Sequence, residues 1–233
     1  MRTTKKIFFV TSTGTDLGKT YISKNLIRIF KKKKISINPY KPIVSGVNKK
    51  NLFQSDGALL LKELNLNISV KDIKQISPWI FKQPLAPTLA AKKEKKKIKY
   101  STIIKWFKNE LKLLKNDFAL IEGVGGLMVP IGEKKTFIDF ICKFNIPIIL
   151  VIGNYLGTIS HTLSLIKTIE LANLHIINIV LNEGNEKKIK INDTEFLLRE
   201  NLEKKYKIRK IYNSRNNEKA FEEIFQDTFK YFI

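Results

Sequence analysis

The sequence predicts an α/β fold in which a mostly parallel sheet is covered by helices on both faces. One observation is a set of short apolar runs, at 7–10, 118–121 and 147–153, whose nearly continuous pattern is typical of strands buried on both faces. A second is that segments with helical spacing of apolar residues separate these runs, as in consecutive βαβ units. With 233 residues, 43% of them hydrophobic, the chain is expected to form a single domain, 1–233.

The loop that follows the first predicted strand reads VTSTGTDLGKT at 10–20, and a segment with helical spacing follows at 22–30. Strand, loop and helix in this order are the context of a phosphate loop, where backbone N–H groups and the positive end of the helix converge on phosphate oxygens. Lys19 is placed to reach the terminal phosphates and Thr20 to ligate Mg²⁺. The general pattern has a glycine where this chain has Thr13, and a plain strand-to-helix turn is the alternative. We predict a fold of the phosphate-loop nucleoside triphosphatase type.

A stiff loop is expected after the second strand, which we place at 34–39. Two prolines and a glycine keep the segment 39–46 out of helix, so Lys41 and Ser45 project from a fixed path. In a parallel sheet this loop lies at the carboxyl ends of the strands, beside the phosphate loop.

The next part of the chain alternates helices with irregular segments. The residues QSDG at 54–57 introduce a helix, in which Asp56 is either a cap or first-turn charge or a carboxylate offered to a metal. The segment 78–87 is irregular and apolar enough to wall a pocket. The lysine-rich segment 92–100 is the most linker-like part of the chain, and a helix at 102–114 follows it.

The strand at 118–121 ends in Glu122 and a glycine-rich turn, EGVGG. An acidic residue at the tip of a buried strand is the arrangement that holds Mg²⁺ or its water in phosphate-loop enzymes. The glycines allow the backbone to approach a ligand closely. A plain turn with a surface glutamate is the alternative, and the nearby phosphate loop favours the metal role.

The remaining chain continues the alternation of strands and helices. A helix at 157–171 carries His161, which we expect to pack or to make a polar contact, since it has no partner at metal-ligand spacing. Asn182 follows a predicted strand and could pair with an adenine through its amide, although a turn asparagine is commoner. The other predicted elements are a short helix that opens at 136–139, strands at 147–153, 176–181 and 208–211, and helices at 193–204 and 218–232.

The net charge of +22 raises the question of nucleic-acid binding. Only five of the 43 basic residues are arginine, and an excess of lysine, isoleucine and asparagine is what A+T-rich codons supply. The two dense lysine runs, 31–34 and 92–99, are not interleaved with arginine and aromatic residues as a stacking platform would be. We therefore expect no specific nucleic-acid partner.

The chain is expected to be cytoplasmic, with no membrane partner. No apolar run approaches the ~20 residues that span a bilayer, and the run after Lys6 is too short for a signal peptide. Cys142 is the single cysteine, so no internal disulfide can form, which suits a reducing compartment. Its apolar neighbours predict a small buried side chain rather than a nucleophile.

Several motifs follow one another in a fixed order between about residues 6 and 183. They are GKT at 18–20, YKPIVSG at 40–46, SD at 55–56, EGVGG at 122–126, TFID at 136–139, and LG at 156–157 followed by His161. This ordered set resembles the ATP-dependent dethiobiotin synthetase family. The resemblance implies a Mg²⁺- and ATP-dependent ligase of biotin synthesis that converts 7,8-diaminopelargonic acid and CO₂ to dethiobiotin, ADP and phosphate. It also implies a homodimer in which the second subunit contributes to the diamine site.

The resemblance further implies the roles of individual residues. Lys19 and Lys41 would be catalytic, because they would neutralise charge that shifts between carbamate and γ-phosphate. Thr15 and Ser45 would orient the carbamate and the diamine.

A larger set of residues would contact the nucleotide and its metal. The Mg²⁺ ligands would be Thr20, Asp56 and Glu122. The nucleotide contacts would be Asp16, Leu17, Gly18, Lys19, Thr20, Tyr21, Asp56, Glu122, Gly123, Val124, Gly125, Asn182 and Glu183.

The chain departs from the pattern of this family in four places. Ser12 stands where the family usually has glycine, Asp16 where it has glutamate, and Tyr155 where lysine is common. A late Gly-x-x-Pro stretch that helps to hold the adenine is not visible around 210–214. These departures concern nucleotide affinity and base preference more than the phosphate chemistry.

The alternative function is a partitioning ATPase of the deviant phosphate-loop class, which would use the basic surface to bind DNA. Those proteins carry a signature lysine five residues before the loop lysine. Gly14 occupies that place, so we favour the ligase hypothesis.

Overall fold

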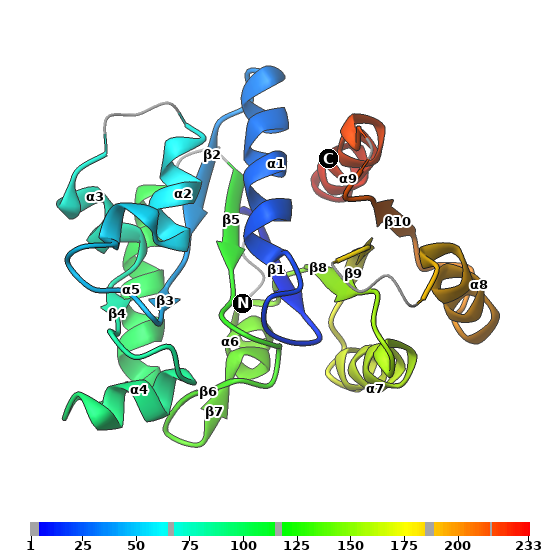
Figure 1. Ribbon diagram of the computed structural model, residues 1–233. Coiled ribbons are helices and arrows are strands. Elements are labelled where there is room, and N and C mark those ends of the chain that lie inside the picture. Colours follow the sequence, from blue (N-terminus) through cyan, green and yellow to red (C-terminus); the bar gives the residue numbers. More distant parts are fainter. Residues whose placement is uncertain (1–4, 65–67, 115–117, 185–188, 215) are drawn as a thin grey trace.

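A computed structural model describes residues 5–64, 68–114, 118–184, 189–214 and 216–233 (Figure 1). Its main sheet has six strands, and every neighbouring pair is parallel. The predicted parallel α/β architecture is therefore confirmed. In spatial order the strands are β10 (Ile208–Ile211), β9 (Ile176–Asn182), β8 (Ile148–Gly153), β1 (Lys6–Ser12), β5 (Phe118–Glu122) and β2 (Ile37–Tyr40).

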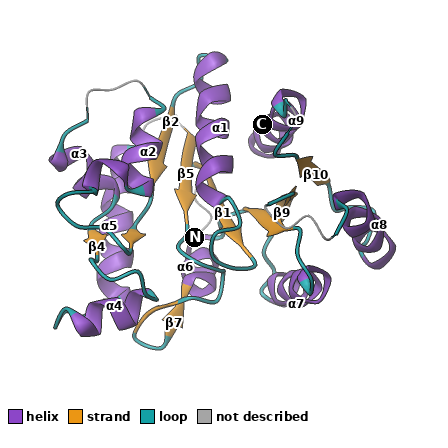
Figure 2. Cartoon of the chain, viewed as in Figure 1, coloured by secondary structure: helices purple, strands orange, loops and turns teal. Residues whose placement is uncertain are grey.

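Helices cover both faces of this sheet (Figure 2). On one face, α1 (Lys19–Lys32) and α9 (Glu218–Phe232) bury aromatic and aliphatic side chains such as Phe30 and Phe225. The helices that pack on the other face are α5 (Tyr100–Leu113), α6 (Phe137–Phe144), α7 (Thr158–Leu171) and α8 (Ile191–Asn201). The shorter helices are η1 (Leu52–Gln54), α2 (Asp56–Lys62), α3 (Val70–Ile76) and α4 (Pro87–Lys93).

The central strand β1 shows why the sheet needs two helical layers. Ile7 and Phe9 lie in the core that contains α5 and α6, whereas Phe8 and Val10 lie in the core of α1 and α9. All four are at most 1% exposed. An apolar side chain gains about 1.5–3 kcal/mol on full burial, so a strand that is apolar on both faces is stable only between two layers. Because β1 lies inside the sheet, between β8 and β5, the loop that follows it leaves the sheet near its centre.

Two short helices of seven residues each were not predicted. The first, α3, is fixed locally by a capping box between Ser69 and Asp72. The second, α4, extends to Lys93 and thus takes the first residues of the expected linker at 92–100. The segment 78–87, which we expected to be irregular, contains the short strand β4 (Trp79–Ile80) and the first residue of α4.

Two small strand pairs were also missed. One joins β3 (Ile43–Val44) to β4 (Trp79–Ile80), and the other joins β6 (Pro130–Gly132) to β7 (Lys135–Thr136). In the second pair, Glu133 and Lys134 form the turn with φ values of 53° and 56°. Turns of this kind favour Gly, Asn or Asp, so the sequence contains no turn signal here.

The expectation of a buried Cys142 was wrong, because this side chain is exposed. The residues that α6 buries are Phe137, Phe140, Ile141 and Phe144, which form one stripe along the helix. Cys142 lies just outside this stripe and faces solvent. Within the described residues, every helix is too short or too polar to cross a membrane.

Candidate active site

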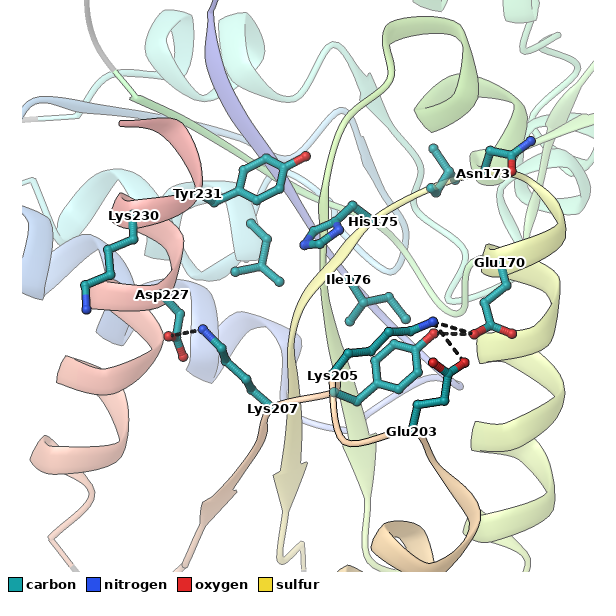
Figure 3. Close-up of a pocket in the computed structure, with 13 residues that line it drawn as sticks. Glu170, Asn173, His175, Ile176, Glu203, Lys205, Lys207, Asp227, Lys230 and Tyr231 are labelled. Carbon is teal, nitrogen blue, oxygen red and sulfur yellow. Dashed lines mark hydrogen bonds and ion pairs between the residues drawn. The ribbon is translucent and has the colours of Figure 1, made fainter.

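Two hollows among the described residues lie at opposite ends of the strands of the main sheet. The carboxyl-end cavity, of about 620 Å³, lies where β1, β2 and β5 end. The amino-end hollow, of about 800 Å³, lies where β9 and β10 begin (Figure 3). It is lined by Glu170, Asn173, Leu174, His175, Ile176, Ile177, Glu203, Lys205, Tyr206, Lys207, Asp227, Lys230 and Tyr231. Of these two hollows, only the carboxyl-end cavity is lined by predicted site residues. It lies at the carboxyl ends of the strands, where α/β sheets bind ligands.

Strand register explains why distant residues meet at the carboxyl-end cavity. Val10 of β1 pairs with Glu122 of β5, and Tyr40 of β2 pairs with Ile121. Lys41 directly follows β2, so it leaves the sheet beside Glu122. The phosphate loop leaves β1 on the other side of β5.

The phosphate loop packs against the end of β9. Gly18 caps α1 with a φ of 94°, and a Cβ at this position would lie 2.4 Å from Nδ2 of Asn182. The same Nδ2 donates to the Leu17 carbonyl oxygen at 3.1 Å. A glycine is therefore required at 18, both for its backbone conformation and for space. Asn182, the predicted base contact, lies beside the loop and fixes it.

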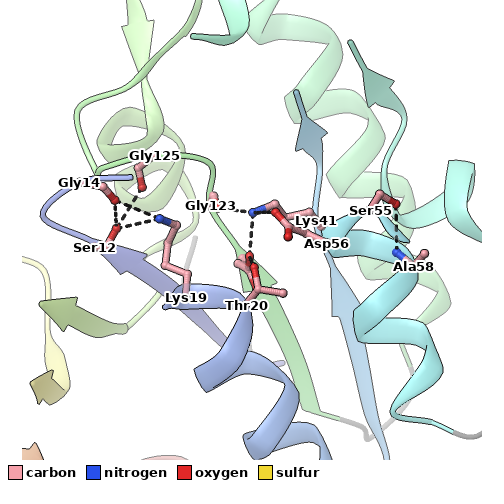
Figure 4. A network of polar contacts seen from close by, with 11 residues as sticks. Ser12, Gly14, Lys19, Thr20, Lys41, Ser55, Asp56, Ala58, Gly123 and Gly125 are labelled. Carbon is pink, nitrogen blue, oxygen red and sulfur yellow. Dashed lines mark hydrogen bonds and ion pairs between the residues drawn. The ribbon is translucent and has the colours of Figure 1, made fainter. Parts of the chain in front are cut away.

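Lys19 folds back over the loop that precedes it (Figure 4). Its Nζ donates to Ser12 Oγ at 2.9 Å and to the Gly14 carbonyl oxygen at 3.0 Å. Ser12 Oγ also donates to the Gly125 carbonyl oxygen at 3.1 Å, so it joins the two glycine-containing loops. Burial, together with the nearby charge of Lys41, lowers the pKa of Lys19 to about 8.

Lys41 is almost completely buried, at 1% exposure, between acidic groups. Its Nζ contacts Glu122 Oε1 at 2.7 Å and the Gly123 carbonyl oxygen at 2.8 Å. A third contact joins it to Asp56 Oδ2 at 3.1 Å. Burial alone would lower the pKa of Lys41, but Glu122 and Asp56 outweigh burial and raise it. The side chain therefore remains a cation.

Asp56 begins α2, but the residue that caps this helix is Ser55, whose Oγ accepts from the Ala58 N–H at 3.4 Å (Figure 4). The carboxylate of Asp56 is thus free of the capping role and turns to Lys41. Burial acts to raise the pKa of Asp56, but Lys41 and a hydrogen bond with Thr20 outweigh it and lower the pKa. Asp56 is an anion at neutral pH.

Glu122 is fully buried beside the carboxyl-end cavity and is not one of the residues that line it. Thr20 Oγ1 donates to Glu122 Oε1 at 2.7 Å, and Lys41 contacts the same oxygen. Glu122 Oε2 is buried without a hydrogen-bond partner among the described residues. A buried carboxylate oxygen in this state needs a cation, a water or a donor from a ligand.

The carboxyl-end cavity contains most of the predicted residues. Those lining it are Thr15, Asp16, Gly18, Lys19, Thr20, Tyr21, Lys41, Ser45, Asp56, Val124 and Gly125. The Oγ of Ser45 is buried without a partner among the described residues, as a substrate-binding hydroxyl would be. Residues 84–87 complete the wall, as the proline-rich segment led us to expect.

Some predicted residues act behind the cavity rather than in its wall. A Cβ at Gly123 would lie 2.9 Å from the Phe9 ring, so glycine lets the turn pack on β1. Leu17 reaches toward Gly153, where a Cβ would lie 2.7 Å from its Cδ2. The carboxylate of Glu183 accepts the Asn213 N–H at 2.8 Å and fastens the segment after β10.

Two features of the site could not be predicted from the sequence. The link from Ser12 to Lys19 could not be foreseen, because a serine at this place shows only that the usual glycine is absent. Val129 lines the cavity from a turn whose path depends on tertiary packing. His161 does make a polar contact, since its Nδ1 lies 2.9 Å from the Tyr155 hydroxyl.

The fold and the loop place this chain in the class of phosphate-loop nucleoside triphosphatases. Among solved structures, a plasmid partition protein from Borrelia burgdorferi matches with a TM-score of 0.58 and 12% identity, over 98% of this chain and 100% of that one. The cell division ATPase MinD from Pyrococcus furiosus matches with a TM-score of 0.52 and 14% identity, over 96% of this chain and 99% of that one. At these identities the likeness shows the fold alone.

Sequence relatives identify the family. The family described as AAA domain matches residues 6–220. The ATP-dependent dethiobiotin synthetase BioD of Acidiphilium cryptum is 32% identical over 194 residues, which is 82% of this chain and 86% of that protein. The enzyme of the same name from Legionella pneumophila is 37% identical over 169 residues, 71% of this chain and 74% of that one. The chain belongs to the ATP-dependent dethiobiotin synthetase family.

Proposed function

We propose that this protein converts 7,8-diaminopelargonic acid and CO₂ to dethiobiotin, with hydrolysis of ATP to ADP and phosphate. Family membership supports the reaction. The observation in this chain that carries the proposal is the contact of the buried Lys41 with the buried Glu122, and with Asp56, at the cavity that Lys19 also lines. Burying such charges is costly unless they are paired, and a fold tolerates them where chemistry needs them.

The proposed reaction moves negative charge from one group to another. One amine of the substrate captures CO₂ as a carbamate and releases a proton. A carbamate oxygen then attacks the γ-phosphorus and ADP leaves, after which the second amine attacks the carbonyl carbon and phosphate leaves as the ring closes. Lys19 and Lys41 would neutralise the oxygens on which this charge develops. Thr15 and Ser45 would hold the diamine near the carbamate, which supplies the entropic part of the catalysis.

We also propose that Mg²⁺ binds together with ATP. Thr20, Asp56 and Glu122 offer a hydroxyl and two carboxylates, the hard oxygen ligands that Mg²⁺ prefers. The unpartnered Oε2 of Glu122 supports a cation at this place. The described residues contain no group of three His, Cys, Asp or Glu side chains that could hold a metal alone, so the phosphates would complete the coordination. The metal would supply charge neutralisation on the β- and γ-phosphates.

The reaction can be tested directly. The purified protein is incubated with ATP, Mg²⁺, bicarbonate and 7,8-diaminopelargonic acid, and the products are measured by mass spectrometry. We expect ADP and dethiobiotin in equal amounts, with no dethiobiotin when the diamine is omitted. The Lys41→Ala variant is the matched control for the site. ADP release that does not depend on the diamine would argue for an ATPase of another function.

We propose further that the active form is a homodimer, as the family resemblance implies. Sedimentation velocity at assay concentration checks this assembly. We expect a species of about twice the chain mass of 27.0 kDa. A monomer with full activity would contradict the proposal.

A further inference from the structure

We propose that Lys41 is an internal cation, which occupies the carboxylates of the metal site in the nucleotide-free protein and must leave them before the metal binds. The inference rests on the proposed function in one respect, the binding of a divalent metal with the nucleotide. It gives Lys41 a role before the reaction, in addition to its proposed part in the reaction itself.

The ammonium group of Lys41 is saturated. A lysine Nζ carries three N–H donors and no acceptor. In this structure it has three acceptors, which are Glu122 Oε1, the Gly123 carbonyl oxygen and Asp56 Oδ2, at 2.7, 2.8 and 3.1 Å. No donor remains for an oxygen of a phosphate or a carbamate. At least one of these contacts must therefore break before Lys41 can act on a substrate.

The buried carboxylate of Glu122 needs a positive charge at every stage. The Glu122 side chain is fully buried, and an uncompensated carboxylate in such a place is strongly destabilising. In the nucleotide-free protein, Lys41 is the cation that contacts both Glu122 and Asp56. A divalent metal would supply two positive charges to the same carboxylates, and Lys41 would no longer be required there.

Metal and Lys41 compete for one carboxylate. Glu122 Oε1 already accepts from Thr20 and from Lys41, each at 2.7 Å, and Oε2 is buried without a partner among the described residues. A metal that takes Thr20 and this Oε2 as ligands would share the carboxylate with the ammonium group of Lys41. Two cations on one buried carboxylate repel each other. Metal binding thus releases Lys41 toward the cavity.

Lys19 provides the contrast within the same site. Its Nζ is held by a hydroxyl and a carbonyl oxygen, of Ser12 and Gly14, which are neutral acceptors. Hydrogen bonds between a cation and a carboxylate are roughly twice as strong as neutral ones. Phosphate oxygens alone can therefore draw Lys19 away from its contacts, whereas Lys41 needs a competing cation.

The backbone of Lys41 is anchored, so the release is a side-chain movement. The Lys41 N–H donates to the Ile76 carbonyl oxygen at 3.1 Å, and Pro42 follows with a fixed φ. Because metal and Lys41 exclude each other, metal binding without nucleotide is weak. A nucleotide that accepts the released ammonium group strengthens metal binding, and by reciprocity the metal strengthens nucleotide binding.

The test measures binding of Mn²⁺, used as a spectroscopic substitute for Mg²⁺, by electron paramagnetic resonance without nucleotide. We expect the Lys41→Met variant, which keeps the length of the side chain but not its charge, to bind Mn²⁺ about tenfold or more tightly than the unchanged protein. Lys41→Arg keeps the charge and should bind Mn²⁺ as weakly as the unchanged protein. Lys19→Met is the matched control and should raise Mn²⁺ affinity much less than Lys41→Met does, because among the described residues Lys19 contacts only neutral acceptors. Equal or weaker Mn²⁺ binding by Lys41→Met would overturn the proposal.

A second measurement needs no loss of charge and applies even if Lys41→Met does not fold. In protein labelled with ¹⁵N at lysine Nζ, a buried, hydrogen-bonded ammonium group gives a slowly exchanging signal, which the Lys41→Arg variant assigns by its loss. We expect this signal to change when a non-hydrolysable ATP analogue is added with Mg²⁺, and to stay unchanged when the analogue is added with a chelator. A signal that is the same in both conditions would show that Lys41 stays in place and would also overturn the proposal.

These experiments separate the inference from the proposed function. Neither uses the diamine or measures turnover. If the protein fails to make dethiobiotin while Lys41→Met binds Mn²⁺ more tightly, the proposed reaction is wrong and the internal cation stands. If dethiobiotin forms while Mn²⁺ affinity is unchanged, the reaction stands and the internal cation is wrong.

Discussion

The carboxyl-end cavity and the amino-end hollow contain the same kinds of charged side chain but differ in burial. In the amino-end hollow, Lys207 contacts Asp227 at 2.6 Å, and these side chains are 51% and 10% exposed. In the carboxyl-end cavity, Lys41 contacts Glu122 at 2.7 Å, and these side chains are 2% and 0% exposed. Because solvent screens exposed pairs, similar distances correspond to very different interaction energies. Burial of the charges, rather than the size of the hollow, therefore makes the carboxyl-end cavity the candidate site.

The arrangement of contacts supports the same distinction. Lys205 in the amino-end hollow is shared between Glu170 and Glu203 at the surface, where water can replace any contact. In the carboxyl-end cavity, the hydroxyl of Ser45 and one oxygen of Glu122 are buried without partners among the described residues. Such atoms are costly unless a ligand or water satisfies them. The amino-end hollow contains exposed ion pairs, whereas the carboxyl-end cavity borders buried polar atoms that have no partner among the described residues.

The largest expected difference between the two regions is in turnover. Lys41→Ala should reduce dethiobiotin formation by about 10³-fold or more, because it removes positive charge where negative charge develops. Lys207→Ala, in the amino-end hollow, should leave turnover unchanged. Both variants are measured by steady-state release of ADP, with circular dichroism as the check on folding. Near-normal turnover of a folded Lys41→Ala variant would remove the proposed mechanism.

Many lysines line neither region. If their number reflects A+T-rich codons, DNA should bind weakly, with a dissociation constant of about 10⁻⁴–10⁻⁶ M at physiological salt. The affinity should fall steeply as more salt is added. Fluorescence anisotropy with unrelated duplexes over a range of salt concentrations checks this. Tight binding that resists salt would instead favour the partitioning ATPase, whose signature lysine is replaced here by Gly14.

A smaller effect is expected from pH, because Lys19 has a lowered pKa of about 8. Phosphate groups favour the protonated lysine, so the pKa of Lys19 is higher in the nucleotide complex than in the free protein. Binding is then at full strength below pH 8 and weakens as pH rises through 8, by about tenfold between pH 7 and pH 9. Isothermal titration with an ATP analogue measures the change, and Lys19→Arg, which stays charged, should abolish it. Constant affinity of the unchanged protein over this range would contradict the environment assigned to Lys19.

The smallest effect is expected in the amino-end hollow itself. Lys207→Ala removes the half-exposed partner of Asp227, which keeps its contact with Arg209, so the melting temperature should change by less than about 3 °C. Differential scanning calorimetry at low and high salt is the measurement. A larger decrease in melting temperature at low salt would mean that the ion pairs of this hollow stabilise the protein more than their exposure indicates.

The main sheet was predictable because its signals are strong and local. Nearly continuous apolar runs predict buried parallel strands, and parallel strands place their carboxyl ends at one edge. That geometry alone predicts that Lys19, Lys41 and Glu122 approach one another, although they are far apart in sequence. The roles of these residues stay predictions until activity is measured, and so does the single domain.

The remaining features depend on information that spacing does not contain. Helix α3 is short, and the turn of Glu133 and Lys134 uses residues that rarely adopt its conformation. The exposure of Cys142 depends on which residue of an apolar stretch falls outside the buried stripe. The capture of Lys41 by Glu122 and Asp56 depends on side-chain distances, which appear only when two strand ends and the start of α2 are placed together.

The glycine turn after β5 rests on an aromatic cluster. Gly123 packs on the ring of Phe9, whose centroid lies 5.5 Å from that of Phe137 and 6.2 Å from that of Phe140, both in α6. The position of Glu122 is thus set from behind by rings that contact no ligand. We expect laboratory evolution toward a different divalent ion to select substitutions in these phenylalanines, because a repacked ring can shift the carboxylate while every coordinating residue stays the same.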